Sequence, residues 1–397
     1  MSVPPIVALE IGTSKVRAIV GEAREDGTLM ITAIGECPSR GVRKGEIADF
    51  DNALACVRAA LQLADENGKV VINLVHLLLS GGHIKSLVNR GSLPILDHGG
   101  EITPEDIEHV METARAVNIP GDRDVLHTIC QHFYVDDQDG VSNPLGMEGS
   151  KLAMDMLILH GVRSRLRNMV KVVRTAGVDV QDVAFGGLCA ALGVLTPEDK
   201  ESGVVVIDLG GGTTDYVVYA HNAIADAGAF AVGGDHVTND IAYGLRIPTA
   251  EAERLKESSG SALVDLAARA QRIPVMPAGA GASEKTVKLS DLNTIIHLRV
   301  EEVLNLVKAQ LVRNNYLRSL RGGIVLTGGG AQLRQVDALA ERIFGLPCRI
   351  GRPTGVSGIT AVTNSPEYAA TVGLVRYAFK SAMKEAEKQT FGGWFKG

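Results

Sequence analysis

Cysteine, aromatic side chains, basic charge and long apolar runs are all scarce in this sequence. The five cysteines are scattered without a CxxC spacing, which argues against a disulfide framework or a zinc site and indicates reduced thiols. The 46 acidic side chains outnumber the 40 basic ones, and the net charge of −6 argues against nucleic acid as a bulk partner. What remains is typical of an ordinary globular protein, with 45% hydrophobic residues.

No segment is long and apolar enough to predict a membrane span. The most apolar block, residues 70–79, is interrupted by Asn73 and His76, and it is shorter than the ~20 residues that a span requires. The first ten residues lack the basic start and the apolar stretch of a signal peptide. We therefore expect a cytoplasmic protein, and 397 residues are enough for two domains with large cores.

An internal repeat is the clearest feature that is present. Val7–Val20 has the pattern of strand, tight turn and strand, and Val205–Val218 has the same pattern. Glu10 matches Asp208, 198 residues further on, which is half the chain. The repeat predicts two related α/β domains, each opening with the same hairpin.

Changes in hydrophobic period divide the rest of the chain. Helical spacing is found at 51–66, 103–117, 248–258 and 291–315, strand patterns at 125–135 and 151–160, and a Pro- and Gly-rich loop at 274–283. The predicted parts are a first domain core (1–80 and 161–196), an inserted α+β subdomain (81–160), a second domain core (197–230 and 315–379), a small lobe of the second domain (231–314), and a polar linker with a tail (380–397).

Three glycine turns after apolar strands predict a site for the phosphates of a nucleotide. A glycine turn lets backbone N–H groups approach phosphate oxygens, and a neighbouring hydroxyl adds a donor. One such turn can be a plain tight hairpin, but two copies half a chain apart and a third turn favour one shared site. The predicted nucleotide-binding residues of these turns are Gly12, Thr13, Ser14 and Lys15; Gly210, Gly211, Gly212, Thr213 and Thr214; and Gly328, Gly329 and Gly330.

A further glycine pair and a charged pair are candidates for the same ligand. Gly233 and Gly234 lie between a predicted strand and a predicted helix. Glu253 and Lys256 lie three residues apart on one helix face, where they could bracket a ribose and an adenine. In isolation, a pair with this spacing is more often a surface ion pair.

Acidic residues just before two of the turns predict a magnesium site. Glu10 and Asp208 occupy this place in the two copies of the repeat. Hydrated Mg²⁺ suits them because it keeps several waters and contacts few carboxylates. The predicted cofactors are therefore ATP and Mg²⁺. No residue has the pattern of a general base, so no catalytic residue is predicted.

These segments, in this order, resemble the motifs of the actin-like ATPase superfamily. Glu10–Lys15 and Asp208–Asp215 resemble its two phosphate motifs, and Leu326–Ala331 resembles its adenosine motif. Ala184–Ala190 and Ala370–Val375 resemble its two connecting motifs. The resemblance implies an actin-like two-domain fold with duplicated mixed-sheet cores. The first motif usually starts with Asp, so the glutamate found here implies inefficient hydrolysis.

Within that superfamily, nearly the whole chain resembles the FtsA family of bacterial division proteins. Cys37–Gly45, Leu79–Ile84, Val125–Tyr134 and Asn143–Met147 are similar to segments of that family. The resemblance implies a scaffold, not an enzyme, that assembles into filaments and anchors FtsZ to the cytoplasmic membrane at the division septum. Later division proteins are further implied partners. The alternatives are a phosphotransferase or chaperone-type ATPase on this fold, or a pilus-assembly relative.

The resemblance also implies a binding site for the C-terminal peptide of FtsZ and a membrane-targeting tail. The basic residues implicated in peptide binding by the family fall on Lys285 and Arg299. Alternatively, the stem of Arg299 only covers the edge of an apolar stripe and its charged end is solvated. In the tail, three aromatic residues fall on one helical face beside lysine, a pattern that suits the bilayer interface. Alternatively, the aromatic rings pack back on their own domain. The predicted membrane residues are Phe391, Trp394, Phe395 and Lys396.

Overall fold

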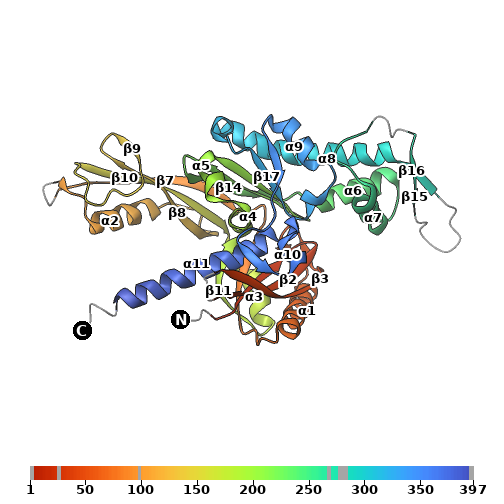
Figure 1. Ribbon diagram of the computed structural model, residues 1–397, viewed down its shortest axis with the longest axis horizontal. Helices are drawn as coiled ribbons and strands as arrows, with labels where there is room; N and C mark the ends of the chain where they lie inside the picture. The colour runs from red at the N-terminus through yellow and green to blue at the C-terminus, as the bar shows by residue number, and fades with distance from the viewer. Residues whose placement is uncertain (1–3, 25–27, 97–99, 266–269, 276–284, 393–397) are drawn as a thin grey trace.

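The computed structural model describes residues 4–24, 28–96, 100–265, 270–275 and 285–392, with the backbone alone at residue 285 and at 384–392. Two sheets that open with the same hairpin form the centre of the molecule, one above the other in Figure 1. A third sheet projects from one end, and a mainly helical lobe projects from the other. The fold is therefore two duplicated α/β cores with one insertion in each.

The first domain is built on a six-stranded sheet in the order β11-β6-β1-β2-β3-β19. Its strands are β1 (Ile6–Ile11), β2 (Lys15–Ala23), β3 (Leu29–Pro38), β6 (Leu74–Leu79), β11 (Asp179–Phe185) and β19 (Val356–Gly358), with a small hairpin of β4 (Val42–Arg43) and β5 (Glu46–Ile47). Its helices are α1 (Phe50–Gly68), α3 (Arg163–Thr175), α4 (Gly186–Val194) and α10 (Thr360–Thr363), with η4 (Pro366–Tyr368). The β1–β2 pair is antiparallel and β1–β6 is parallel, so the sheet is mixed.

The second domain repeats this plan with a five-stranded sheet in the order β14-β13-β12-β17-β18. Its core was predicted at 197–230 and 315–379, and the end of that range is wrong, because β19 pairs with β3 of the first sheet and α11 (Ala369–Gly392) packs on α4 and β1 of the first domain. Its strands are β12 (Val204–Leu209), β13 (Thr214–Ala220), β14 (Ala223–Phe230), β17 (Ile324–Thr327) and β18 (Cys348–Ile350). Its helical elements are α5 (Pro197–Ser202), η2 (Tyr316–Ser319), η3 (Gly329–Gln332) and α9 (Val336–Phe344). The central strands are almost wholly buried, as expected for apolar strands covered on both faces.

The insertion in the first domain is a separate α+β unit, as predicted. Its sheet has the order β7-β10-β8-β9 and one helix packs against it. Thr103 caps that helix and forms a capping box with Asp106, so its first turn is well satisfied. The elements are β7 (Lys85–Pro94), α2 (Pro104–Arg115), β8 (Arg123–Val135), β9 (Gln138–Val141) and β10 (Lys151–Val162).

The small lobe of the second domain contains α6 (Gly234–Leu245), α7 (Thr249–Ser259), β15 (Arg272–Val275), β16 (Lys285–Lys288) and α8 (Leu289–Arg313). The loop expected from residue 274 begins later, because Pro274 lies in β15, paired with Thr286 of β16. A two-stranded ribbon has only edge strands, which tolerate proline. Residues 276–283 of that predicted loop lie outside the described part of the chain.

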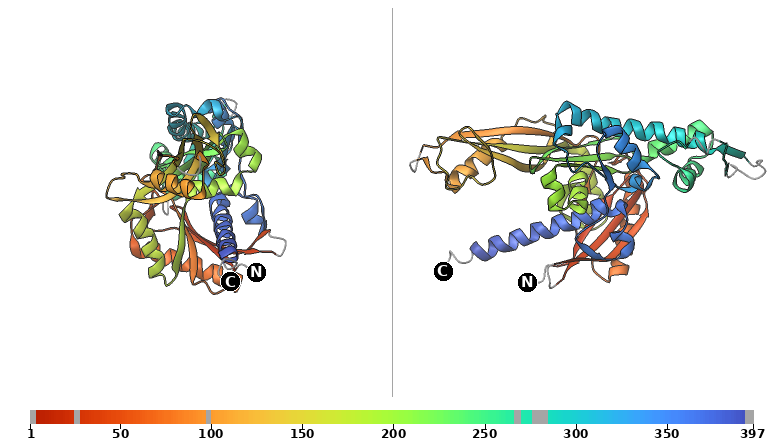
Figure 2. Two further views of the ribbon diagram at one scale, coloured as in Figure 1. Left: turned by 90° about the vertical axis from the view of Figure 1, so that its left-hand side faces the viewer. Right: turned by 45° about the horizontal axis from the view of Figure 1, so that its top comes forward.

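The C-terminal helix α11 (Ala369–Gly392) leaves the first domain as one long rod (Figure 2). The polar linker predicted from residue 380 is therefore part of this helix. Residues 380–390 contain Ala, Met, Glu, Lys and Gln, which favour helix, and neither Gly nor Pro. Of the predicted membrane residues, Phe391 lies in the last turn of the helix, while Trp394, Phe395 and Lys396 lie outside the described residues. No described helix is long and apolar enough to cross a bilayer.

Candidate functional site

A cavity of about 510 Å³ lies between the two domains. This volume is within the ~300–1,000 Å³ of typical small-molecule sites. It is lined by the β1–β2 turn, the β12–β13 turn, the η3 turn, the first turn of α6 and residues of α7 and α8. All of the predicted nucleotide-binding and metal-binding residues contribute to the cavity lining.

The two hairpin turns have the same geometry. Gly12 N donates to Lys15 O at 3.0 Å, and Gly210 N donates to Thr213 O at 2.9 Å. Each turn is four residues long and is closed by one backbone hydrogen bond. The sequence repeat is therefore also a structural repeat at the site.

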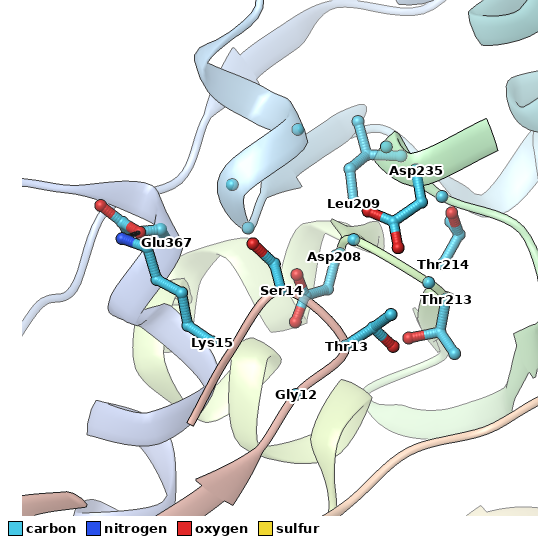
Figure 3. Close-up of a pocket in the computed structure, with 18 of the residues that line it drawn as sticks. Gly12, Thr13, Ser14, Lys15, Asp208, Leu209, Thr213, Thr214, Asp235 and Glu367 are labelled. Atoms are coloured by element: carbon cyan, nitrogen blue, oxygen red, sulfur yellow. Dashed lines mark hydrogen bonds and ion pairs between the residues drawn. The ribbon is translucent and has the colours of Figure 1, made fainter. Parts of the chain in front are cut away.

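The two turns face each other closely across the cavity (Figure 3). A Cβ atom on Gly211 would lie 3.1 Å from Cβ of Ser14. A Cβ atom on Gly212 would collide with Oγ1 of Thr13, which itself accepts a hydrogen bond from Gly45 N at 3.0 Å. These glycines are required because only a turn without side chains allows the two domains to approach so closely.

The third glycine turn closes another side of the cavity. Gly328 has a φ of 82° and lies directly against the Asp208 carboxylate, so no side chain fits there. Gly330 packs on Leu209 in a similar way. Gly329 is different, because a Cβ atom placed on it meets nothing within 4 Å. It is therefore the glycine at which an added side chain would enter the cavity without displacing protein.

The start of α6 supports the second glycine turn. Gly234 N donates to Gly210 O at 2.9 Å, and Asp235 N donates to Gly211 O at 2.8 Å. These N–H groups are already hydrogen-bonded within the protein. The predicted pair Gly233 and Gly234 therefore helps to hold the second glycine turn in shape. Thr214 has a similar role, since its fully buried hydroxyl donates to Val232 O at 2.8 Å.

The predicted pair on α7 is an ion pair in the cavity wall. Lys256 Nζ lies 2.8 Å from Glu253 Oε2 and also donates to Thr238 Oγ1 at 3.0 Å. The Lys256 side chain is only 17% exposed. The pair is therefore both the ion pair that the spacing indicates and part of the cavity.

The carboxylates predicted to hold a metal lie close enough to affect each other. Burial, followed by the charge of Glu10, raises the pKa of Asp208 to about 7. Burial, followed by the charge of Asp208, raises the pKa of Asp215 well above its usual range. The described residues contain no ready cage of three or more metal ligands. Hydrated Mg²⁺ needs only one or two carboxylates, and a cation would relieve this repulsion, so the residues fit it.

Arg17 is a buried member of the site that the sequence reasoning missed. Its guanidinium contacts the Glu367 carboxylate, lies 2.6 Å from Glu36 Oε2 and lies 3.6 Å from Glu10 Oε2. Lys15 joins the same network, with its ammonium 2.8 Å from Glu36 and 3.2 Å from Glu367. The sequence repeat could have indicated Arg17, since it is the cross-strand partner of Glu10 in the first hairpin.

Asp215 was missed in the same way, as the cross-strand partner of Asp208 in the second hairpin. Ser80, the residue after β6, donates to Asp215 Oδ1 at 2.6 Å, and its hydroxyl oxygen also lies 3.1 Å from Thr213 Oγ1. No sequence spacing indicates this contact, because Ser80 and Asp215 come from different domains. Asp215 is the most deeply buried carboxylic acid near the phosphate turns.

The residues predicted to bind the FtsZ peptide lie outside the cavity. Arg299 is on α8, 2.5 Å from Asp240 of α6 and 2.6 Å from Glu302. Lys285 is the first residue of β16, in the same lobe. Arg299 thus ties two helices of the small lobe together, with its side chain 25% exposed.

Comparisons with known proteins place this chain in a family. A family model described as "Cell division protein FtsA" matches residues 205–373, and one described as "SHS2 domain inserted in FTSA" matches residues 81–160, the predicted insertion. The cell division protein FtsA of Pseudomonas aeruginosa is 38% identical over 375 residues, which cover 94% of this chain and 89% of that protein. That of Escherichia coli K12 is 36% identical over 404 residues, covering 98% and 96%.

Solved structures show the same fold at low sequence identity. A PilM–PilN type IV pilus biogenesis complex matches with a TM-score of 0.66 and 16% identity, covering 94% of this chain and 98% of that one. MreB5 of Spiroplasma citri bound to ADP matches with a TM-score of 0.57 and 18% identity, covering 96% and 98%. These likenesses confirm the predicted actin-like fold. Together with the relatives above, they show that the chain belongs to the FtsA family of cell division proteins.

Proposed function

We propose that this protein binds ATP with Mg²⁺ in the cleft between its domains, assembles into filaments, and anchors FtsZ to the membrane during division. The observation that carries the nucleotide proposal is the meeting of the two glycine turns, with Gly211 against Ser14 across the cavity. A phosphate chain held between the turns would contact both domains at once. Ligand binding would therefore favour the closed arrangement.

The charges of the cavity support a metal–nucleotide complex over a bare nucleotide. Seven acidic and four basic side chains line it, and the acids outnumber the bases even without Asp208 and Asp215, whose pKa values are raised, so a polyphosphate alone would meet net repulsion. Mg²⁺ would neutralise the phosphates and the acids together. Glu10 and Asp208 are the residues placed to hold it through its waters. The related fold of Spiroplasma MreB5 has been solved bound to ADP, which is consistent with this proposal.

We propose a scaffold with slow hydrolysis. The Asp215 carboxyl is the best-placed candidate to accept a proton from water, but it is tied to Ser80 at 2.6 Å. A carboxylate occupied in this way is a poor general base in the resting state. Turnover is therefore expected far below the ~1–100 s⁻¹ of kinases. A phosphotransferase on this fold would show the faster rate.

The proposed FtsZ site is the α6–α8 face of the small lobe. Tyr243 on α6 is 88% exposed, and Leu298 on α8, next to Arg299, is 59% exposed. Exposed apolar side chains beside a basic residue suit a short peptide with apolar and acidic side chains. A hollow at the end of α6 adjoins this face and is lined by Ala242, Tyr243, Gly244, Arg246, Ile247 and Pro248.

The proposed membrane anchor is the segment at the end of α11. Three aromatic residues and a lysine within seven residues suit the bilayer interface. One such tail is a weak anchor, since burying one large apolar side chain is worth ~1.5–3 kcal/mol and ordering offsets part of that. A filament presents many tails, and linked weak sites bind far more tightly than single ones. Assembly and attachment would therefore reinforce each other.

The test is co-flotation of FtsZ with liposomes. FtsZ should float with liposomes only when this protein and ATP with Mg²⁺ are present. A protein truncated after Lys388 should leave FtsZ in the soluble fraction while still binding FtsZ. FtsZ that floats equally well with the truncated protein would contradict the tail as anchor.

A further inference from the structure

The Glu10 carboxylate is held by a side chain from the C-terminal helix α11. Thr371 Oγ1 donates to Glu10 Oε2 at 2.6 Å. Thr371 is fully buried, in the first turn of α11, 361 residues away in sequence. Among the described residues, no other group donates a hydrogen bond to the Glu10 side chain, and the nearest cation, Arg17, is 3.6 Å from the same oxygen.

This bond orients the carboxylate toward the glycine turn. With Oε2 held by Thr371, the other oxygen, Oε1, lies 3.4 Å from the Cβ position of Gly12, at the start of the turn. Oε1 is thus the oxygen left to contact a hydrated metal ion. A glutamate is longer than the aspartate usual at this place in the superfamily, so it has more rotamers to restrain.

The position of Thr371 is itself rigid. Helix α11 packs on α4 at backbone contact, since Gly373 lies directly against the Cys189 carbonyl and Gly193 against the Ala369 carbonyl. Side chains at these glycines would separate the helices. The threonine hydroxyl is therefore fixed relative to β1, and the Glu10 carboxylate is fixed with it.

We propose that Thr371 is a positioning residue that holds Glu10 in the orientation needed for the Mg²⁺ of the bound nucleotide; this rests on the proposed function. Without the hydroxyl, the Glu10 carboxylate is free to rotate toward the Arg17 guanidinium and close the 3.6 Å gap. A closer ion pair would neutralise the carboxylate and withdraw it from the metal. The predicted defect concerns the metal, not the nucleotide itself.

The experiment measures the Mg²⁺ concentration at which binding of a fluorescent ATP analogue is half-saturated. Thr371→Val, which keeps the shape and removes the hydroxyl, should raise that concentration about tenfold, because a hydrogen bond to a charged group is worth ~1.5–3 kcal/mol. Binding in EDTA should be unchanged. Thr371→Ser, which keeps the hydroxyl, should keep the wild-type value, and Thr360→Val at an exposed residue of α10 is the control.

An unchanged Mg²⁺ requirement in Thr371→Val would overturn the proposal. Equal weakening with Mg²⁺ and in EDTA would also overturn it, since it would show a general packing role. If Thr371→Val does not fold, Thr371→Ala provides the same comparison with less bulk. Failure of the wild-type protein to bind any nucleotide would instead refute the proposed function, and this proposal with it.

Discussion

Ser80 of the first domain donates a 2.6 Å hydrogen bond to Asp215 of the second, at the base of the cavity. Asp215 is only 4% exposed, so this bond satisfies a buried acid across the domain boundary. Ser80→Ala should therefore lower the free energy of unfolding by about 1–3 kcal/mol. Chemical denaturation measures this, with the exposed Ser202→Ala as control. Equal stability of the two variants would show that the contact contributes nothing.

Arg17 is expected to be the most sensitive charged residue of the cleft. It is 6% exposed and lies against three partly buried carboxylates, so Arg17→Ala removes the cation beside Glu10 and leaves Glu36 and Glu367 with Lys15 alone. The loss of stability should be about 3–5 kcal/mol. Arg167→Ala, at a side chain 71% exposed, should cost little. Thermal unfolding of the two variants side by side tests this, and similar midpoints would contradict it.

His127 should make the junction of the insertion sensitive to acid. Burial lowers the pKa of His127 to about 4, with Asp182 opposing the shift. Its Nε2 accepts a hydrogen bond from Phe185 N at 3.0 Å, which requires the neutral ring. Between pH 6.5 and pH 4 the unfolded state binds more protons at this residue than the folded state, so stability is complete above about pH 6.5 and falls as the pH falls.

His127→Gln should remove part of this acid sensitivity, since an amide oxygen can still accept from Phe185 N. Denaturation at pH 7 and pH 5 should show a smaller loss for the variant than for the wild type, by about 1–2 kcal/mol. His109→Gln, at an exposed histidine of the same subdomain, should behave as wild type. If His127→Gln loses as much stability as the wild type, another group is responsible.

The α6–α8 face should bind the C-terminal peptide of FtsZ. Tyr243→Ser should weaken binding about tenfold or more, because hot spots are often exposed aromatic side chains that become buried. Arg299→Glu should also abolish peptide binding. It should leave ATP binding unchanged, because Arg299 lies outside the cavity. Fluorescence anisotropy with labelled peptide measures both. Val71→Ser, at an apolar residue 82% exposed on the first domain, is the control.

The sequence predicted the elements of this fold because glycine turns, caps and apolar periods are local signals. The hairpins, the insertion and the helix predicted from residue 103 are of this kind. Contacts between segments far apart in the sequence have no local signal, which is why Ser80 and Thr371 were not found. Arg17 and Asp215 could have been found from the aligned repeat. Arg17 pairs with Glu10 across the first hairpin, and Asp215 pairs with Asp208 across the second. Residues 380–390 are helical because they continue α11, and their polar composition alone does not predict this.

Direct titration of ATP with Mg²⁺ into the purified protein tests the cleft assignment most sharply. Gly329→Val is the variant of choice, because its side chain would enter open cavity space, whereas Gly212→Val would collide with Thr13 and disturb the fold itself. Gly121→Val adds the same atoms in open space at a glycine that does not line the cavity. The wild type and Gly121→Val should bind one ATP per chain. Gly329→Val should bind at least tenfold more weakly, with an unchanged melting temperature in the absence of nucleotide; equal affinity in all three proteins would contradict the assignment.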